Sequence, residues 1–211
     1  MSFSYETKNE LCRLPVQKLC CARAEAYGIL LYCNTFSATE VRVITENPNF
    51  AERLPKLFRR AFGLSFDRQP DKEQTEGKRI FQITDPRKLN HIINVLGYDP
   101  QQNLVLHINF AFMEESCDQA AFLRGAFFAG GSITDPQKRY HLELTTSHLQ
   151  VSREIESLLV ECGYPPKSLS RNGSSITYFK QSDQIEDFLT MIGAPVAAMN
   201  IMSAKLEKDL R

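Results

Sequence analysis

The sequence lacks the features that mark several protein classes. No apolar run of 18 residues could span a membrane, and the N-terminus, "MSFSYETKNELCRL", lacks the basic-then-apolar order of a secretory signal. Its 6 cysteines form no CxxC pair, which disfavours a zinc ribbon or a thioredoxin-like motif. No phosphate-binding loop or cofactor-lysine motif is present either. We therefore expect a cytoplasmic protein with reduced cysteines acting as small apolar residues, no metal and no cofactor.

The sequence also lacks an excess of charge of either sign, since it has 25 Lys and Arg against 25 Asp and Glu. A protein that binds nucleic acid strongly by itself usually shows a basic excess. Its length of 211 residues, 43% hydrophobic content and 24% charged content are ordinary for one or two soluble domains. Any DNA binding must therefore come from a local patch, or from a segment outside this chain.

The most informative feature that is present is an internal repeat. The segments "LCCARAEAYGILLYCNTFS" and "ESCDQAAFLRGAFFAGGSI" both place a cysteine eight positions before a glycine, Gly28 or Gly125, and the copies lie 97 residues apart. A glycine inside a helix costs about 0.5–1 kcal/mol relative to alanine. Because the glycine recurs at the same position of both copies, we expect a close contact between two helices and not an unrelated packing contact. Asn34 and Gly131 end the two runs, and we expect both to stop a helix with positive φ.

The repeat continues beyond these helices. The segment "ITDPRKLNHIINVLGY" matches "FKQSDQIEDFLTMIGA" 96 residues later, and alternating strand-like and helical runs fill both halves. Each half therefore predicts an αββαββα unit of an α+β protein. The predicted organisation is a first repeat at 1–98, an inter-repeat linker at 99–114, a second repeat at 115–194 and a polar helical tail at 195–211. The stretch "LPKLFRRAFGL" could be an exposed interaction surface, but its periodicity favours a helix that buries Leu57, Phe58 and Phe62.

A duplicated unit whose first helix has a central glycine and a small-residue end resembles the LAGLIDADG homing-endonuclease fold. That resemblance implies that Gly28 and Gly125 meet where two central helices pack about a pseudo-twofold axis, beneath a saddle-shaped antiparallel sheet. The run "FLRGAFFAGGSITDP" followed by "YHLE", together with the opening "FSYETKNEL", is similar to the bacterial WhiA family over essentially the whole chain. The resemblance implies an N-terminal LAGLIDADG-like domain, with a C-terminal helix-turn-helix domain that we expect beyond this chain.

LAGLIDADG nucleases place one acidic residue near the end of each central helix, where the pair holds a divalent metal. The motif aligns these two positions with Cys33 and Gly130, and neither side chain is an oxygen ligand. Glu25, Asp118 and Asp135 lie elsewhere in the two segments and form no symmetric pair. We therefore predict no catalytic residues, no metal and no enzyme activity.

The resemblance also implies that the saddle faces DNA. Basic residues on or beside the predicted strands could contact phosphates. The alternative is an ordinary solvated face of mixed charge, because Glu40 and Glu143 lie on the same strands. The candidate DNA-contacting residues are Arg42, Lys78, Arg79, Arg139, Lys167, Arg171 and Lys180.

Taken together, the resemblance implies a monomeric, non-catalytic N-terminal domain of a DNA-binding transcription regulator for sporulation or cell-division genes. Its expected partners are double-stranded DNA, bound mainly through the C-terminal domain and placing the protein at the nucleoid, and a partner regulator protein. The alternatives are a protein-interaction or ligand-sensing domain without DNA binding of its own, or an active homing endonuclease.

Overall fold

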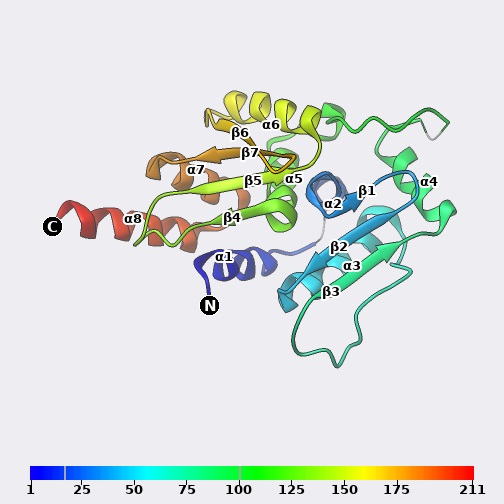
Figure 1. Cartoon of the computed structure of the whole chain (residues 1–211), viewed down its shortest axis with the longest axis horizontal. Coiled ribbons are helices and arrows are strands. Elements are labelled where there is room, and N and C mark those ends of the chain that lie inside the picture. Colours follow the sequence, from blue (N-terminus) through cyan, green and yellow to red (C-terminus); the bar gives the residue numbers. More distant parts are fainter. Residues whose placement is uncertain (17, 100) are drawn as a thin grey trace.

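Two antiparallel sheets lie side by side over a layer of helices in the computed structural model (Figure 1), which describes residues 1–16, 18–99 and 101–211. Residues 17 and 100, in the predicted first repeat and linker, lie outside the described residues. The first half contains α1 (Phe3–Cys12), α2 (Leu19–Tyr32), β1 (Thr35–Phe36), β2 (Val41–Thr45), α3 (Pro48–Phe62), β3 (Arg79–Ile83) and α4 (Pro86–Val95).

The second half begins with a short 3-10 turn and repeats the order of the first. It contains η1 (Phe110–Phe112), α5 (Ser116–Gly130), β4 (Gly131–Ile133), β5 (Leu142–Thr146), α6 (Leu149–Glu161), β6 (Lys167–Arg171), β7 (Ser174–Phe179), α7 (Ser182–Ile192) and α8 (Pro195–Asp209). The sheet orders are β1-β2-β3 and β4-β5-β7-β6, and every pairing is antiparallel. The predicted α+β fold class is confirmed.

The first half departs from the predicted αββαββα pattern by one strand. Where the second sheet has β6, the described residues of the first half contribute only an isolated bridge between Arg68 and Gln82 of β3. The segment leading to β3 is rich in charged residues and contains Pro70, so it cannot sustain the alternation of a strand. A side chain fixes its position instead, because Asp67 accepts the backbone N–H groups of Thr84 and Asp85 at 2.7 and 2.8 Å.

The prediction that Asn34 and Gly131 stop the central helices with positive φ is wrong. Gly131 has φ −94° and begins β4 directly, and Asn172 is the one non-glycine residue with positive φ in the described part of the chain. Asn34 acts through its side chain, whose Oδ1 accepts the N–H of Ile44 at 2.9 Å. Gly131 is required for space, since a Cβ there would lie 2.6 Å from the carbonyl oxygen of Phe127.

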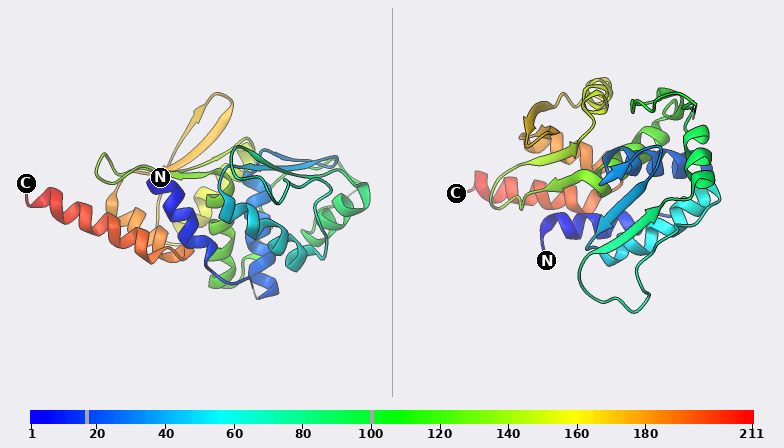
Figure 2. Two further views of the ribbon diagram at one scale, coloured as in Figure 1. Left: turned by 90° about the horizontal axis from the view of Figure 1, so that it is seen from below. Right: turned by 45° about the vertical axis from the view of Figure 1, so that its right-hand side comes forward.

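The central helices α2 and α5 run away from the sheets, side by side, in the left view of Figure 2. Both are apolar on nearly all sides because sheets and outer helices surround them. The outer helix α3 buries Leu57, Phe58 and Phe62, which confirms the interpretation of that stretch as a core helix. Among the described residues, no helix is both long and apolar enough to cross a bilayer.

The segment between the halves is tied to α2 by two tyrosines. The hydroxyl groups of Tyr27 and Tyr98 lie 2.6 Å apart. Tyr27 donates to the carbonyl of His107 at 2.7 Å and accepts the N–H of Asn109 at 2.9 Å. The segment is therefore fixed to the first half by buried hydrogen bonds. At the other end of the chain, the predicted polar tail exposes apolar side chains as well, on α8 at Val196, Met199, Met202 and Leu206 and just after it at Leu210.

Candidate nucleic-acid interface and the central helix pair

The two central helices touch backbone to backbone at Gly28 and Gly125. A Cβ on Gly28 would lie 2.1 Å from the carbonyl oxygen of Phe122, and one on Gly125 would lie 2.0 Å from that of Glu25. Glu25 and Phe122 themselves stand 97 residues apart, as the two glycines do, so the contact is pseudo-symmetric. Only a hydrogen atom fits between the helices at either point.

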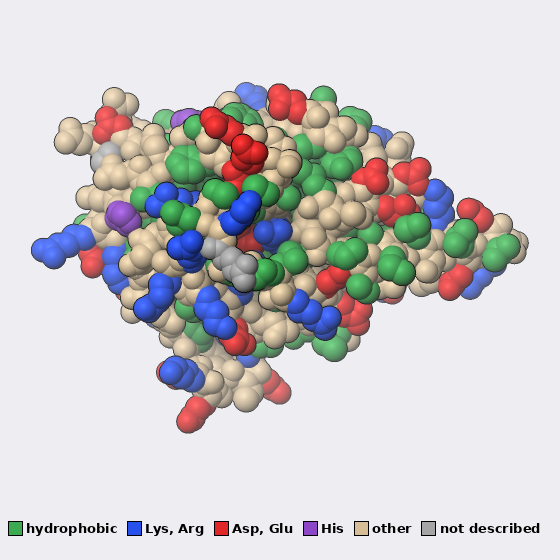
Figure 3. All heavy atoms as spheres, turned by 180° about the vertical axis from the view of Figure 1, so that it is seen from behind, with side chains coloured by type: hydrophobic (Ala, Val, Ile, Leu, Met, Phe, Trp, Pro, Cys, Tyr) green, Lys and Arg blue, Asp and Glu red, His purple; other side chains and the backbone are tan. Residues whose placement is uncertain are grey.

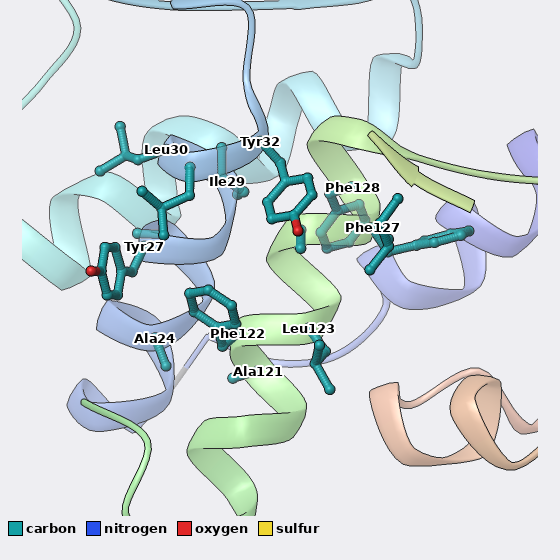
Figure 4. Close-up of a cluster of buried hydrophobic side chains, with 14 of the residues drawn as sticks. Ala24, Tyr27, Ile29, Leu30, Tyr32, Ala121, Phe122, Leu123, Phe127 and Phe128 are labelled. Carbon is teal, nitrogen blue, oxygen red and sulfur yellow. The ribbon is translucent and has the colours of Figure 1, made fainter. Parts of the chain in front are cut away.

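Aromatic packing surrounds this contact. Figure 4 shows Phe122 of α5 beside Tyr27 of α2, and their ring centroids lie 5.5 Å apart in an edge-to-face arrangement. Phe128 of α5 stacks on Phe50 of α3 at 4.8 Å. Aromatic rings therefore pack on both sides of the helix pair and fix its position under the sheets.

A buried ionic triad joins α2, α3 and α5 one turn from the glycine contact. The Glu25 carboxylate is 1% exposed and accepts from Arg53 Nε at 2.8 Å and from Arg124 Nε at 2.6 Å. Arg53 also donates to the carbonyls of Cys12 and Leu14, and Arg124 donates to that of Ile192 at 3.0 Å. The carboxylate is thus fully engaged in structure and is not available to a substrate.

The positions where a nuclease needs its acids lie at the C-terminal ends of these helices. Cys33 Sγ lies 3.3 Å from the carbonyl oxygens of both Leu30 and Thr35 and donates its one hydrogen to either, and burial raises the pKa of the thiol to about 12. At Gly130 a Cβ would lie 2.4 Å from the carbonyl oxygen of Thr145 and 2.9 Å from Cδ1 of Tyr32. The residues at these two ends do not fit a magnesium ion, which prefers oxygen ligands.

Three other carboxylates could have supplied an oxygen ligand, and all lie elsewhere. Asp135 accepts the N–H of Gln137 at 2.9 Å in an exposed turn. Asp118 stands in the first turn of α5, at the far end of the helix from Gly130. Glu25 is held in the triad. None of them meets another carboxylate at the helix C-terminal ends.

The sheet surface facing away from the helices has mixed charge. On the first sheet, Arg42 pairs with Glu40 at 3.1 Å. On the second, Arg171 and His141 both contact the Glu143 carboxylate, at 3.3 and 3.1 Å. Arg42 and Arg171 are therefore each partly neutralised by a neighbouring acid.

The predicted DNA-contacting role of Arg79 is wrong. Arg79 is 5% exposed, and its guanidinium donates to the carbonyls of Gln74, Gly77 and Glu46 at 3.0–3.3 Å. It closes the base of the loop before β3 and cannot reach a phosphate. The other six candidates are exposed, and they fall into a first-sheet pair, Arg42 and Lys78, and a second-sheet group of Arg139, Lys167, Arg171 and Lys180.

The β6–β7 hairpin places part of the second-sheet group away from the body of the molecule. In the left view of Figure 2 this hairpin stands away from the helices, and every residue of β6 is exposed. Lys167 and Arg171 occupy its two ends, while Lys180 Nζ lies 5.5 Å from the ring centre of Tyr178. Cationic side chains on a projecting hairpin are well placed to follow a groove of DNA.

Comparison with known proteins identifies the family of this fold. The WhiA LAGLIDADG-like domain model matches residues 119–211. A protein named "Probable cell division protein WhiA" from Ruminiclostridium cellulolyticum is 34% identical over 220 residues, covering 100% of this chain and 70% of the relative. The chain belongs to the WhiA family. A WhiA relative from Alkaliphilus metalliredigens is 30% identical over 223 residues, with the same coverage.

Solved structures agree with the WhiA assignment. Full-length DUF199/WhiA from Thermatoga maritima superposes with a TM-score of 0.75 at 19% identity, covering 99% of this chain and 67% of that one. The homing endonuclease I-DmoI, in complex with DNA and Ca, superposes with a TM-score of 0.60 at 13% identity, covering 87% and 98%. The WhiA fold is thus shared with a DNA-bound LAGLIDADG endonuclease.

Two features of this WhiA chain are absent from the sequence-based predictions. Arg68 lies exposed on the edge of β3, but no alternating pattern marks its segment as part of the sheet. A cluster of Cys20, Cys21, Cys117 and Asp118 gathers at the N-terminal ends of α2 and α5, where no CxxC spacing announces it. The repeat offset of 97 residues, which aligns Cys20 with Cys117 and Cys21 with Asp118, was the available signal.

Proposed function

We propose that this chain is a non-catalytic, DNA-contacting domain of a transcription regulator that controls cell-division or sporulation genes. The single observation that carries the non-catalytic part is the pair of helix ends at Cys33 and Gly130. A half-buried thiol whose pKa is raised to about 12 occupies one end, and a neighbouring backbone carbonyl fills the space of a side chain at the other. Metal-assisted hydrolysis of a phosphodiester needs oxygen ligands at this place. The family membership supports the regulatory part.

The first expected result is that the protein leaves DNA intact. Plasmid incubated with the protein and Mg²⁺ or Mn²⁺ should remain supercoiled, because no carboxylate pair meets at the helix ends. The measurement is agarose electrophoresis over several hours, with an active LAGLIDADG enzyme and its own site as the control for the buffer. Specific double-strand cleavage that Asp135→Asn abolishes would overturn the non-catalytic assignment.

The DNA-contacting part rests on the exposed cations of the second sheet. With Arg42 and Arg171 partly neutralised by acids, the sheet surface offers a few phosphate contacts and not a continuous basic saddle. Weak, sequence-independent contact of this kind adds to the affinity of a separate specific reader without setting its sequence. The domain therefore acts in this proposal as an auxiliary clamp on DNA.

The second expected result is a loss of DNA affinity in a Lys167→Ala, Arg171→Ala, Lys180→Ala variant. We expect about tenfold weaker binding at moderate salt, and a salt dependence whose logarithmic slope falls by about 0.9 for each phosphate contact removed. Fluorescence anisotropy with duplex DNA across a salt series measures both quantities.

The matched control removes three exposed cations from the helical side of the molecule, Arg13→Ala, Lys56→Ala and Arg59→Ala. This control variant changes the net charge by the same amount as the first variant. Because its cations lie away from the sheet surface, it should leave the DNA affinity nearly unaltered. An equal loss in both variants would contradict a role for the sheet surface. If the wild-type chain binds no DNA even at low salt, the ion-paired sheet surface favours the second candidate function, that of a protein-interaction domain.

A further inference from the structure

The N-terminal ends of the two central helices bring four metal-ligand side chains together. Cys20 and Cys21 lie in the first turn of α2, and Cys117 and Asp118 in the first turn of α5. Their ligand atoms all lie within 4.8 Å of one another, and they are the one such group among the described residues. The two pairs are equivalent under the repeat, so the cluster lies on the pseudo-twofold axis. A helix length of about 20 Å separates it from Cys33 and Gly130.

The spacing of these atoms suits one tetrahedral metal ion. Sγ atoms of Cys20 and Cys21 lie 3.9 Å apart, and Asp118 Oδ1 lies 3.6 Å from Cys21 Sγ and 3.8 Å from Cys117 Sγ. Tetrahedral zinc with Zn–S bonds of about 2.3 Å separates its sulfur ligands by about 3.8 Å. The four side chains therefore need only small rotations to enclose a single ion.

The surroundings keep the thiols of the metal-free cluster protonated: burial and the neighbouring thiols raise the pKa of Cys21 to about 12, and the hydrogen bond with Asp118 raises the pKa of Cys20, so a metal must displace these protons. The cluster lies in the first turns of α2 and α5, where the positive dipole ends of the two helices favour negative charge, and neither helix has a side-chain cap. The hollow that Cys21 lines also contains Lys18 and the Glu25–Arg53–Arg124 triad, and these three basic side chains and one acid together carry a net charge of +2. Figure 3 shows Lys and Arg side chains gathered on this face, the side opposite the sheets. A complex of three thiolates, one carboxylate and Zn²⁺ has a net charge of −2, which these groups offset.

We propose that Cys20, Cys21, Cys117 and Asp118 form a structural Zn²⁺ site that fastens the two repeats at the N-terminal ends of their central helices. Three thiols and a carboxylate are a soft ligand set that selects zinc over magnesium or calcium. Binding releases the three thiol protons to solvent, since each sulfur binds as a thiolate. Cys20 is exposed, so the ion can enter from the helical face.

The test begins with the reduced, metal-free chain, in which a thiol assay must count all 6 cysteines. Zn²⁺ titration, read by calorimetry and elemental analysis after gel filtration, is expected to give one ion per chain and a higher melting temperature. Co²⁺ in place of Zn²⁺ is expected to give thiolate-to-cobalt charge-transfer bands and the intense visible bands of a tetrahedral site. A stoichiometry near zero with micromolar Zn²⁺, or an octahedral Co²⁺ spectrum, would overturn the proposal.

Three variants assign the ligands. Cys20→Ser with Cys117→Ser should abolish the metal-dependent rise in melting temperature, and the near-isosteric Asp118→Asn should weaken binding on the order of tenfold or more. Cys162→Ser removes a cysteine outside the cluster and should bind metal as the wild type does. Circular dichroism of each metal-free variant shows whether it folds. Equal metal loss in Cys162→Ser, or none in folded Asp118→Asn, would refute the ligand set.

Discussion

Gly28→Ala is expected to destabilise the domain by at least about 3 kcal/mol, although alanine is the better helix former by about 1 kcal/mol. The added methyl group would lie 2.1 Å from a backbone carbonyl oxygen and 2.8 Å from the N of Ala126, so no side chain can rotate away to make room. The helices α2 and α5 must separate, which breaks the aromatic packing around them. Denaturant unfolding followed by circular dichroism measures the effect, and Gly125→Ala should behave in the same way.

Two comparisons isolate the steric cause. Gly63→Ala changes a glycine with φ +68° and open space around it, and should cost only about 1 kcal/mol from backbone strain. The double variant Gly28→Ala, Gly125→Ala should cost less than the sum of its parts, because one separation of the helices relieves both overlaps. Strict additivity, or a cost at Gly28 no larger than that at Gly63, would show that the close contact does not limit stability.

The sequence predicts the repeated framework of this fold because its signals are local. Alternation gives most of the strands, and three-and-four spacing gives α3 and α6. The glycines Gly28 and Gly125 were recognisable because a costly residue recurs in register. The repeat also predicts a strand in the first sheet equivalent to β6, and this prediction is wrong. In its place, Arg68 alone pairs with Gln82 among the described residues.

The buried triad, the contacts of Arg79 and the metal-ligand cluster could not be predicted from local patterns, because the fold and not the local sequence brings together the residues that meet in each. Glu25 sits 28 residues from Arg53 and 99 from Arg124, and a helix buried on all sides has no polar face on which an acid would stand out. Arg79 looks exposed at the start of a strand, and only the folded loop places three carbonyl oxygens around its guanidinium. The metal-ligand cluster combines residues from both repeats, which motif spacing within one segment cannot detect.

The buried triad gives the second large effect: Glu25→Ala is expected to destabilise the domain by about 3–5 kcal/mol. Removal of the carboxylate leaves Arg53 and Arg124 charged in the interior, without the partner that compensates their lost hydration. Glu40→Ala, which removes an acid from an exposed pair with Arg42, should cost about 1 kcal/mol or less. Denaturant unfolding at low and high salt measures both, and only the surface variant should show a difference that salt removes.

A triple variant separates two contributions to the free energy of unfolding: the penalty for burying unpaired charges and the stabilisation by the triad itself. In Glu25→Leu, Arg53→Met, Arg124→Met the three side chains become apolar with similar volume, so no charge is left buried without a partner. Stability should return to within about 1–2 kcal/mol of the wild type, because desolvation offsets much of the attraction in a buried ion pair. If the triple variant is as unstable as Glu25→Ala, the triad contributes through its hydrogen bonds to the carbonyls of Cys12, Leu14 and Ile192, which link α1 and α7 to the central pair.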